Sequence, residues 1–295
     1  MATVAVVGLG AMGARIAARL LATGNDVVVW NRTRAKADAL VARGAELAAT
    51  PAAAAARAEA VITMVTDPDA LRAVSEGDTG IAAGVRASSA VIQMSTVGPA
   101  ATSRLASVLE GSCGVLDAPV LGSIAEAESG TLTVFVGGDD DTVARWTPLL
   151  STLGRPLHVG GLGAGSAAKL VANATLVGVI AVLGESIALG DSLGLSREAT
   201  FDVLAATPIA GQAERRRPAL ESHDYPPRFA LALARKDAEL IREAAAAAEI
   251  DLRVTEAART WLADAQAAGW GAEDYSSVLE RILGRTDGPP NASRS

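Results

Sequence analysis

The first 21 residues contain the pattern that most restricts the fold of this chain. Residues 3–7 are a run of β-favouring residues, and residues 14–21 have the apolar spacing of a helix. The turn between them reads Gly8-Leu9-Gly10-Ala11-Met12-Gly13. The first glycine of such a turn permits a tight bend, the second lets the backbone approach a pyrophosphate, and the third allows the helix to pack closely on the strand. We therefore predict a dinucleotide-binding unit of an α/β sheet.

The end of the second predicted strand, residues 26–30, indicates which dinucleotide binds. The residues that follow it are Asn31-Arg32-Thr33. An NAD-binding unit usually has an acidic residue here, which binds the ribose 2′-hydroxyl. In this chain a guanidinium and two short hydrogen-bonding side chains take that place, and they suit a phosphate. The sequence predicts NADP(H), the alternative being that Arg32 is an ordinary surface residue at a helix start.

Further predicted strands alternate with helices, as in a doubly wound, mainly parallel sheet. They cover residues 60–65, 90–94, 115–118, 132–136 and 157–159. Ligands of such sheets bind beyond the carboxyl ends of the strands. Two of these ends carry Val65-Thr66 and Ser95-Thr96, which we expect to line the nicotinamide side of the site. Hydroxyls in these positions also serve as helix caps.

Small and polar residues follow strand 115–118 and form the candidate substrate segment, which runs to Gly130. Its centre reads Leu121-Gly122-Ser123. We expect Ser123 to begin a short helix, and we expect the free N–H groups at the start of that helix to bind a substrate carboxylate.

The pattern changes at residue 163, after which helix follows helix to about residue 283. Residues 164–193 are expected to form one long helix, and Pro208, Pro218 and Pro226-Pro227 to separate shorter ones. We therefore predict an N-terminal α/β Rossmann domain at 1–162 and an all-α domain at 163–285. The long helix joins them, and a disordered tail follows at 286–295.

One lysine on the long helix is a candidate for chemistry. The chain has 26 basic residues, but only Lys36, Lys169 and Lys236 are lysines. Apolar residues surround Lys169 in the sequence, and burial makes it easier for a lysine to release its proton, which arginine does not do. Asn173 follows four residues later, on the same helical face. An ammonium and an amide placed together can protonate and hold a carbonyl oxygen; the ordinary alternative is a surface lysine.

Composition excludes other classes of function. With a net charge of −7 the chain has no general attraction for nucleic acid or an anionic membrane. Cys113 is the single cysteine and only His158 and His223 are present, so we expect neither a disulfide nor a metal site. The chain starts directly with a strand, so we predict a cytoplasmic protein without a targeting peptide.

Four motifs occur in an order and spacing that resemble the β-hydroxyacid dehydrogenase family over residues 3 to about 283. They are GLGAMG at 8–13, DAPVLGSIAEAESG at 117–130, GAGSAAKLVAN at 163–173 and KDAEL at 236–240. The family includes 3-hydroxyisobutyrate dehydrogenases and glyoxylate and succinic semialdehyde reductases.

The resemblance implies roles for individual residues. It makes Lys169 the catalytic lysine, Asn173 a substrate-positioning amide and segment 117–130 the substrate-carboxylate site. Thr96, Phe229 and Asp237 become neighbours of the active site or cofactor, and Lys236 a contact on the nicotinamide side. Phe229, Lys236 and Asp237 are also spaced to share one helical face. The resemblance further implies a homodimer.

One departure from the family pattern concerns the substrate. The family commonly has serine and glycines after Pro-Val, whereas this chain has Leu121, which makes the pocket less polar and puts the usual small acids in doubt. Two alternatives to a hydroxyacid dehydrogenase remain. Imine reductases share the fold and the VWNRT-type loop but generally lack the lysine. A non-catalytic NADP-binding module would keep the glycine turn without turnover.

Overall fold

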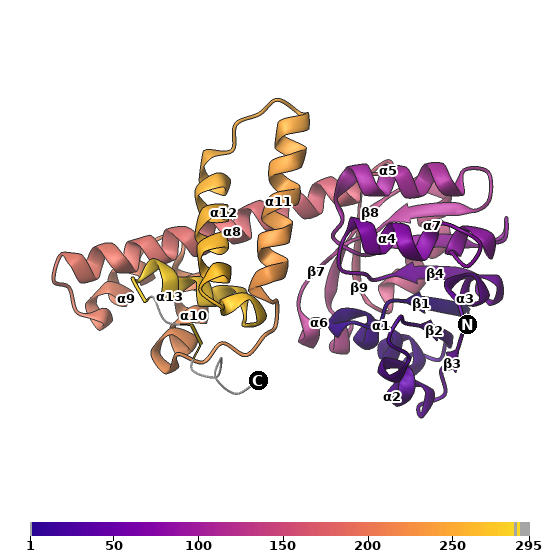
Figure 1. Cartoon of the computed structure of the whole chain (residues 1–295), viewed down its shortest axis with the longest axis horizontal. Coiled ribbons are helices and arrows are strands. Elements are labelled where there is room, and N and C mark those ends of the chain that lie inside the picture. The colour runs from indigo at the N-terminus through magenta and orange to yellow at the C-terminus, as the bar shows by residue number, and fades with distance from the viewer. Residues whose placement is uncertain (1, 286–287, 290–295) are drawn as a thin grey trace. The chain divides into compact units, whose positions relative to one another are not determined.

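The computed structural model describes residues 2–285 and 288–289, so most of the predicted tail lies outside the described residues. The chain divides into two compact units, Met1–Leu170 and Val171–Ser295. Helix α8 (Ala164–Ser192) begins in the first unit and ends in the second (Figure 1). We predicted a domain boundary between residues 162 and 163, just before α8, and the two units divide within the second turn of this helix.

The first unit contains a sheet whose order is β3-β2-β1-β4-β5-β6-β8-β7, with β9 paired to β8. The parallel strands are β1 (Thr3–Val7), β2 (Asp26–Trp30), β3 (Glu46–Leu47), β4 (Ala60–Thr63), β5 (Ala90–Gln93) and β6 (Gly114–Asp117). The order reverses between β1 and β4, which is where open α/β sheets bind ligands. The predicted doubly wound, mainly parallel sheet is confirmed.

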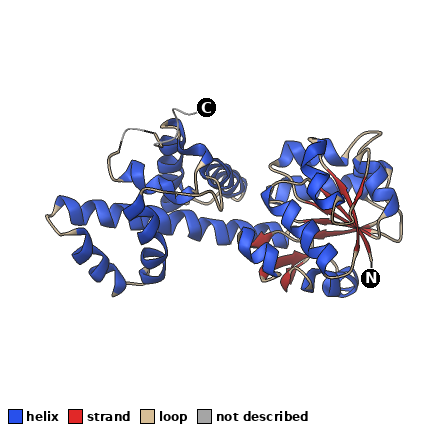
Figure 2. Cartoon of the chain, turned by 90° about the horizontal axis from the view of Figure 1, so that it is seen from below, coloured by secondary structure: helices blue, strands red, loops and turns tan. Residues whose placement is uncertain are grey.

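Side chains along the strands alternate between two cores on opposite faces of the sheet. Val4, Val6 and Ile62 belong to one core, and Ala5, Val7 and Val61 belong to the other. Figure 2 shows helices on both faces of the strands. The first core is covered by α1 (Ala11–Ala22) and α7 (Asp140–Ser151), and the second by α3 (Pro51–Arg57), α4 (Pro68–Ser75) and α5 (Gly98–Leu109). The shorter helices are η1 (Arg34–Ala37), α2 (Asp38–Val41), η2 (Ile81–Ala83) and α6 (Ile124–Ser129).

A second group of strands extends the sheet beyond β6. Strand β8 (Leu132–Gly137) runs antiparallel to β6 and to β7 (Val120–Leu121), and parallel to β9 (Gly154–Gly160). It meets β6 only where its last residue, Gly137, pairs with Asp117. The rest of β8, with β7, therefore continues past the carboxyl edge of the parallel sheet. This ribbon lies on the side where a ligand is expected.

The second unit is helical, as predicted. After α8 it contains α9 (Arg197–Ala205), α10 (Ala210–Ser222), α11 (Leu231–Ala247), α12 (Arg253–Ala267), η3 (Trp270–Ala272), η4 (Tyr275–Ser277) and α13 (Val278–Ile282). By length and composition α8 could span a bilayer, but half of its most apolar stretch is buried inside the protein. It therefore has the character of a core helix.

Two short strands were missed, and two predictions about elements were wrong. Strands β3 and β7 were not predicted, because two residues each are too short to show an alternating pattern. Pro218 does not separate helices and lies inside α10, where Arg216 and Leu220 are buried on either side of it. Phe229 does not share a helical face with Lys236 and Asp237, because α11 begins only at Leu231.

Candidate active site

The glycine turn after β1 has the geometry needed to approach a dinucleotide. Gly8 has a φ of 102°, and a Cβ on Gly13 would overlap the carbonyl oxygen of Gly8. The space around Gly10, by contrast, is open to 4 Å. No side chain among the described residues caps the start of α1 at Gly10. Open space and uncapped N–H groups at a helix start fit the pyrophosphate of a dinucleotide.

Asn31 joins this turn to the end of β2. The N–H of Leu9 donates to Asn31 Oδ1 at 2.9 Å, and Asn31 Nδ2 donates to the carbonyl of Thr33 at 2.9 Å. Arg32 and Thr33 themselves are exposed. The asparagine is therefore a brace between two loops, and the neighbouring guanidinium and hydroxyl are accessible to a phosphate.

The predicted strand-end residues lie at one edge of the sheet. β4 and β5 are parallel, with Thr63 opposite Gln93, so Val65 and Thr96 follow at the same edge. Ser95 is buried, and its hydroxyl oxygen accepts the N–H of Val65 at 2.8 Å. Ser95 thus fixes the two loops to each other. Thr96 is half-buried and Thr66 is exposed.

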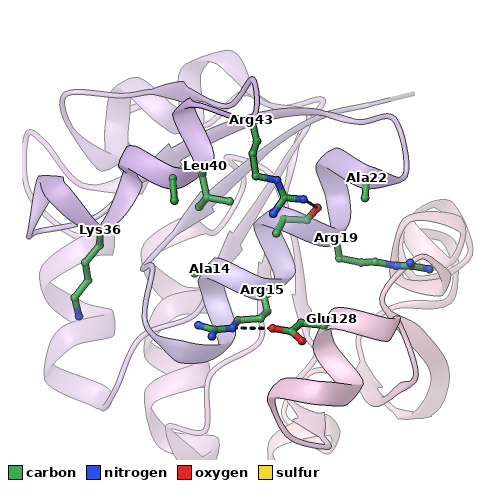
Figure 3. Close-up of a pocket in the computed structure, with 10 residues that line it drawn as sticks. Ala14, Arg15, Arg19, Ala22, Lys36, Leu40, Arg43 and Glu128 are labelled. Carbon is green, nitrogen blue, oxygen red and sulfur yellow. Dashed lines mark hydrogen bonds and ion pairs between the residues drawn. The ribbon is translucent and has the colours of Figure 1, made fainter.

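A basic cavity of about 350 Å³ lies along the outer face of α1 (Figure 3). Its charged lining is Arg15, Arg19, Lys36, Arg43 and Glu128. Arg15 pairs with Glu128 at 3.3 Å, and Arg19 donates to the carbonyl of Thr152 at 2.9 Å. These contacts attach α1 to its neighbours. None of the predicted catalytic or substrate-binding residues lines this cavity.

The substrate segment lies on the β7–β8 ribbon. Leu121 is 40% exposed, and Gly122 has a φ of 139° that favours glycine. Ser123 caps α6, as predicted. Its N–H donates to Glu126 Oε2 at 2.7 Å and its hydroxyl to the same oxygen at 2.5 Å. The expectation that this N–H is free was wrong, because Glu126 occupies it in a capping box.

Lys169 lies one turn into α8 and is only 9% exposed. The first turn of this helix is fixed to the end of β6 by Asp117, which is fully buried. Asp117 Oδ2 accepts the N–H of Ser166 at 2.6 Å, and Oδ1 accepts its hydroxyl at 2.8 Å. Ser166 Oγ also lies 3.0 Å from the hydroxyl of Thr102 on α5. Burial raises the pKa of Asp117, and the hydrogen bonds from Ser166 act in the opposite direction.

In the second unit, two helices bring together Asn173, Asp237 and Lys236. Asn173 is 1% exposed, and its Nδ2 donates to Asp237 Oδ2 at 2.6 Å. Lys236 Nζ lies 2.6 Å from Asp237 Oδ1. The hydrogen bond fixes the rotation of the Asn173 amide, which is what a positioning group needs.

Phe229 precedes α11 and packs against Tyr275, with ring centroids 5.7 Å apart. Its N–H donates to Asp274 Oδ2 at 3.1 Å. A buried carboxylate therefore determines where this aromatic ring lies.

The sequence did not reveal the roles of Asp117 and Ser166, and Ser95, which we expected to line the nicotinamide side, is buried and connects two loops. Each is a small polar residue whose partner lies 30 to 49 residues away. The position of Asp117 at a strand end was the only available signal. Within the described residues, no group of three or more His, Cys, Asp or Glu side chains is placed to hold a metal ion.

Comparison with known proteins places this site in a family. Residues 3–169 match the NAD-binding domain of 6-phosphogluconate dehydrogenase, and residues 163–282 match the NAD-binding domain of NADP-dependent 3-hydroxyisobutyrate dehydrogenase. The chain is 33% identical over 286 residues to 3-sulfolactaldehyde reductase of Escherichia coli, with 96% of each chain covered.

Solved structures give the same result. The 3-hydroxyisobutyrate dehydrogenase of Mycobacterium tuberculosis, with L-serine, has a TM-score of 0.84 at 28% identity and covers 96% of this chain and 99% of its own. An imine reductase from Pseudomonas sp. shares the fold, with a TM-score of 0.62 at 23% identity over 95% of this chain and 99% of its own. The chain belongs to the β-hydroxyacid dehydrogenase family. It is an oxidoreductase with a nicotinamide cofactor, and its relatives act on small hydroxy acids and aldehydes.

Proposed function

We propose that the protein is an NADP(H)-dependent oxidoreductase that interconverts a small β-hydroxy acid, or a 4-hydroxy acid, and its semialdehyde or keto form. The observation that carries this proposal is the burial of Lys169 one helical turn before Asn173, whose amide is fixed by Asp237. Lysine is among the residues least often buried in proteins unless it is paired.

A bound nicotinamide would supply or accept the hydride. Lys169 donates the proton to the carbonyl oxygen during reduction and removes it during oxidation. Asn173 holds the same oxygen or its neighbour, and its bond to Asp237 orients it beforehand. Burial of both side chains strengthens these interactions, because the local dielectric constant is lower than that of water.

The preference for NADPH rests on Arg32 and Thr33. Both are exposed at the end of β2, next to the braced Asn31, and residues 31–37 contain no carboxylate. The glycine turn holds the pyrophosphate, and Val65, Thr66 and Thr96 line the nicotinamide side, with Lys236 and Asp237 as further contacts. Each of these roles is part of the proposal.

For the acid-binding end of the substrate we propose Thr96, Gly122 and Ser123, with Leu121 and Phe229 as apolar walls. A substrate carboxylate has to use the N–H of Gly122 or displace Glu126 from Ser123. Comparison of a semialdehyde with its uncharged aldehyde analogue tests this assignment. A kcat/KM for the uncharged analogue equal to that of the acid would contradict it.

We further propose that the enzyme is a cytoplasmic homodimer. Val171, Val182 and Leu189 are 68%, 44% and 59% exposed and lie eleven and seven residues apart, so they form one apolar stripe along α8. Light scattering of the purified protein measures the oligomeric state, and Val182→Asp should shift a dimer to monomer. A wild-type monomer at micromolar concentration would contradict the proposal.

The experiment that tests the function is a matrix of initial rates. NADPH and NADH are each combined with semialdehydes, 2-keto acids and cyclic imines. We expect turnover of an acidic aldehyde or keto acid with NADPH. Preferential turnover of a cyclic imine would favour imine reduction, and no turnover of any substrate would favour a non-catalytic module.

A further inference from the structure

A buried network of Asp117, Ser166 and Thr102 holds the first turn of α8, one turn before Lys169. All three residues and Lys169 belong to the first unit. Both oxygens of the Asp117 carboxylate accept hydrogen bonds from a single residue, Ser166, through its N–H and its hydroxyl. Two bonds to one residue fix both the position and the rotation of that helical turn.

Close contacts with the surrounding backbone further restrict the position of the first turn of α8. A Cβ on Gly165 would overlap the carbonyl oxygen of Asp117 and lie 2.6 Å from that of Phe135. A Cβ on Gly137 would lie 2.8 Å from the amide nitrogen of Gly165. The start of α8 therefore rests directly on the ends of β6 and β8. Lys169 follows Ser166 by three residues, on the same helical face.

Stability alone does not explain a charged group in this place. Replacing both partners of a buried hydrogen bond by apolar groups of the same shape can be nearly neutral for stability. A fully connected polar network instead specifies one arrangement of the elements that it joins. The arrangement specified here is the orientation of the first turn of α8 on the sheet.

We propose that Asp117 is a positioning residue for the reaction. Through Ser166 it sets the place of the Lys169 ammonium. This inference rests on the proposed function, because it assumes that Lys169 is the proton donor.

The test compares Asp117→Asn with a matched control, Asp139→Asn. Asp139 also caps a helix, accepting the N–H of Thr142 at 2.9 Å, but it caps α7, which carries none of the proposed catalytic residues. We expect Asp117→Asn to lower kcat roughly ten- to a hundredfold, the effect of displacing a catalytic group by about 1 Å. KM should change little, and the basic limb of the kcat against pH profile should move. The control should keep the wild-type kcat and pH profile.

Two further measurements keep the inference testable if Asp117→Asn folds poorly. Ser166→Ala removes the hydroxyl bond but keeps the N–H bond, so its kcat should fall between wild type and Asp117→Asn. Acetylation of Lys169, followed by peptide mass spectrometry with Lys36 as internal reference, needs no substrate. Lys169 should react faster in both variants, because the helical turn is held less firmly against the sheet.

The possible results distinguish a failure of the positioning role of Asp117 from a failure of the proposed function. A wild-type enzyme that reduces none of the carbonyl substrates overturns the proposed function. An active wild type whose kcat, pH profile and Lys169 acetylation are all matched by Asp117→Asn or Ser166→Ala overturns the positioning role alone.

Discussion

The two units use buried polar groups in different ways. In the first unit, Ser95 and Asp117 lie at strand ends and connect the loops and the helix that carry the proposed site. In the second unit, two buried carboxylates, Asp274 and Glu280, tie loops to helices. Glu280 accepts the hydroxyl of Tyr225 at 2.6 Å and pairs with Arg285 at 3.0 Å. The buried polar groups named in the first unit thus support the proposed site, whereas those of the second unit are divided: Asp237 orients Asn173 of the proposed site, and Asp274 and Glu280 join segments of the chain.

The largest expected effect is at Lys169. Both Lys169→Ala and Lys169→Arg should lower kcat by about 10²–10⁴-fold, because arginine keeps the charge but does not release its proton. The measurement is steady-state reduction, with NADPH affinity determined separately by fluorescence. If Lys169→Arg kept more than about a tenth of the wild-type kcat, the lysine would be an electrostatic anchor and not the acid.

The second prediction concerns the buried carboxylate of the helical unit. Asp274 is 4% exposed, lies 3.4 Å from Arg216, and also accepts the N–H groups of Arg228 and Phe229. Asp274→Ala leaves the guanidinium of Arg216 buried without its carboxylate partner, so it should destabilise the protein by about 3–5 kcal/mol. Urea unfolding measures the change.

The control is Asp191→Ala, which breaks an exposed pair with Arg197 in the same unit and should change stability by less than about 1 kcal/mol. NADPH affinity of folded Asp274→Ala should equal that of wild type. If folded Asp274→Ala bound NADPH much more weakly than wild type, Asp274 would also support cofactor binding. The carboxylate would then not act on stability alone.

The third prediction concerns how the first unit selects NADPH over NADH. Arg32→Ala should weaken NADPH binding roughly ten- to a hundredfold, since a charge-assisted phosphate contact contributes about 1.5–3 kcal/mol. NADH binding should be nearly unchanged. Arg34→Ala, two residues along the same exposed segment, is the control and should have a smaller effect. An equal loss for both cofactors would disprove a 2′-phosphate contact.

The first unit was more predictable from the sequence than the second. Strands β1 and β2 were predicted with their observed bounds, because a buried parallel strand is a continuous apolar run, and a glycine turn marks the end of β1. In the helical unit, proline alone was a poor guide. Pro208 precedes α10, but Pro218 lies within it, since packing of the buried side chains around it outweighs one lost hydrogen bond.

The site was predictable only where function depends on a local motif. The glycine turn and the Lys169–Asn173 spacing are contained in short segments. The contacts that support them join distant segments, as Asp117 joins Ser166 across 49 residues and Asn173 joins Asp237 across 64. No spacing rule in one sequence specifies such pairs, because they follow from how strands and helices pack.

The smallest expected effect is the pH dependence of stability that comes from Asp117. Burial raises the pKa of this carboxyl above its ordinary value of 3.8. The folded state therefore binds the proton more tightly than the unfolded state. Below about pH 3.8 the carboxyl is protonated in both states and contributes no pH-dependent difference. As the pH rises, the unfolded chain ionises first, which lowers the free energy of unfolding until the raised pKa is passed.

Asp117→Asn removes this titration, so its stability should fall less than that of wild type as the pH rises from about 4. Melting temperatures of both proteins across pH 4 to 8, in one ionic strength, measure the difference. The stability advantage of wild type over the variant should be greatest at the acidic end and shrink toward neutrality. A wild-type advantage that instead grows with pH would mean that the hydrogen bonds from Ser166 outweigh burial and that the ionised carboxylate itself stabilises the first turn of α8.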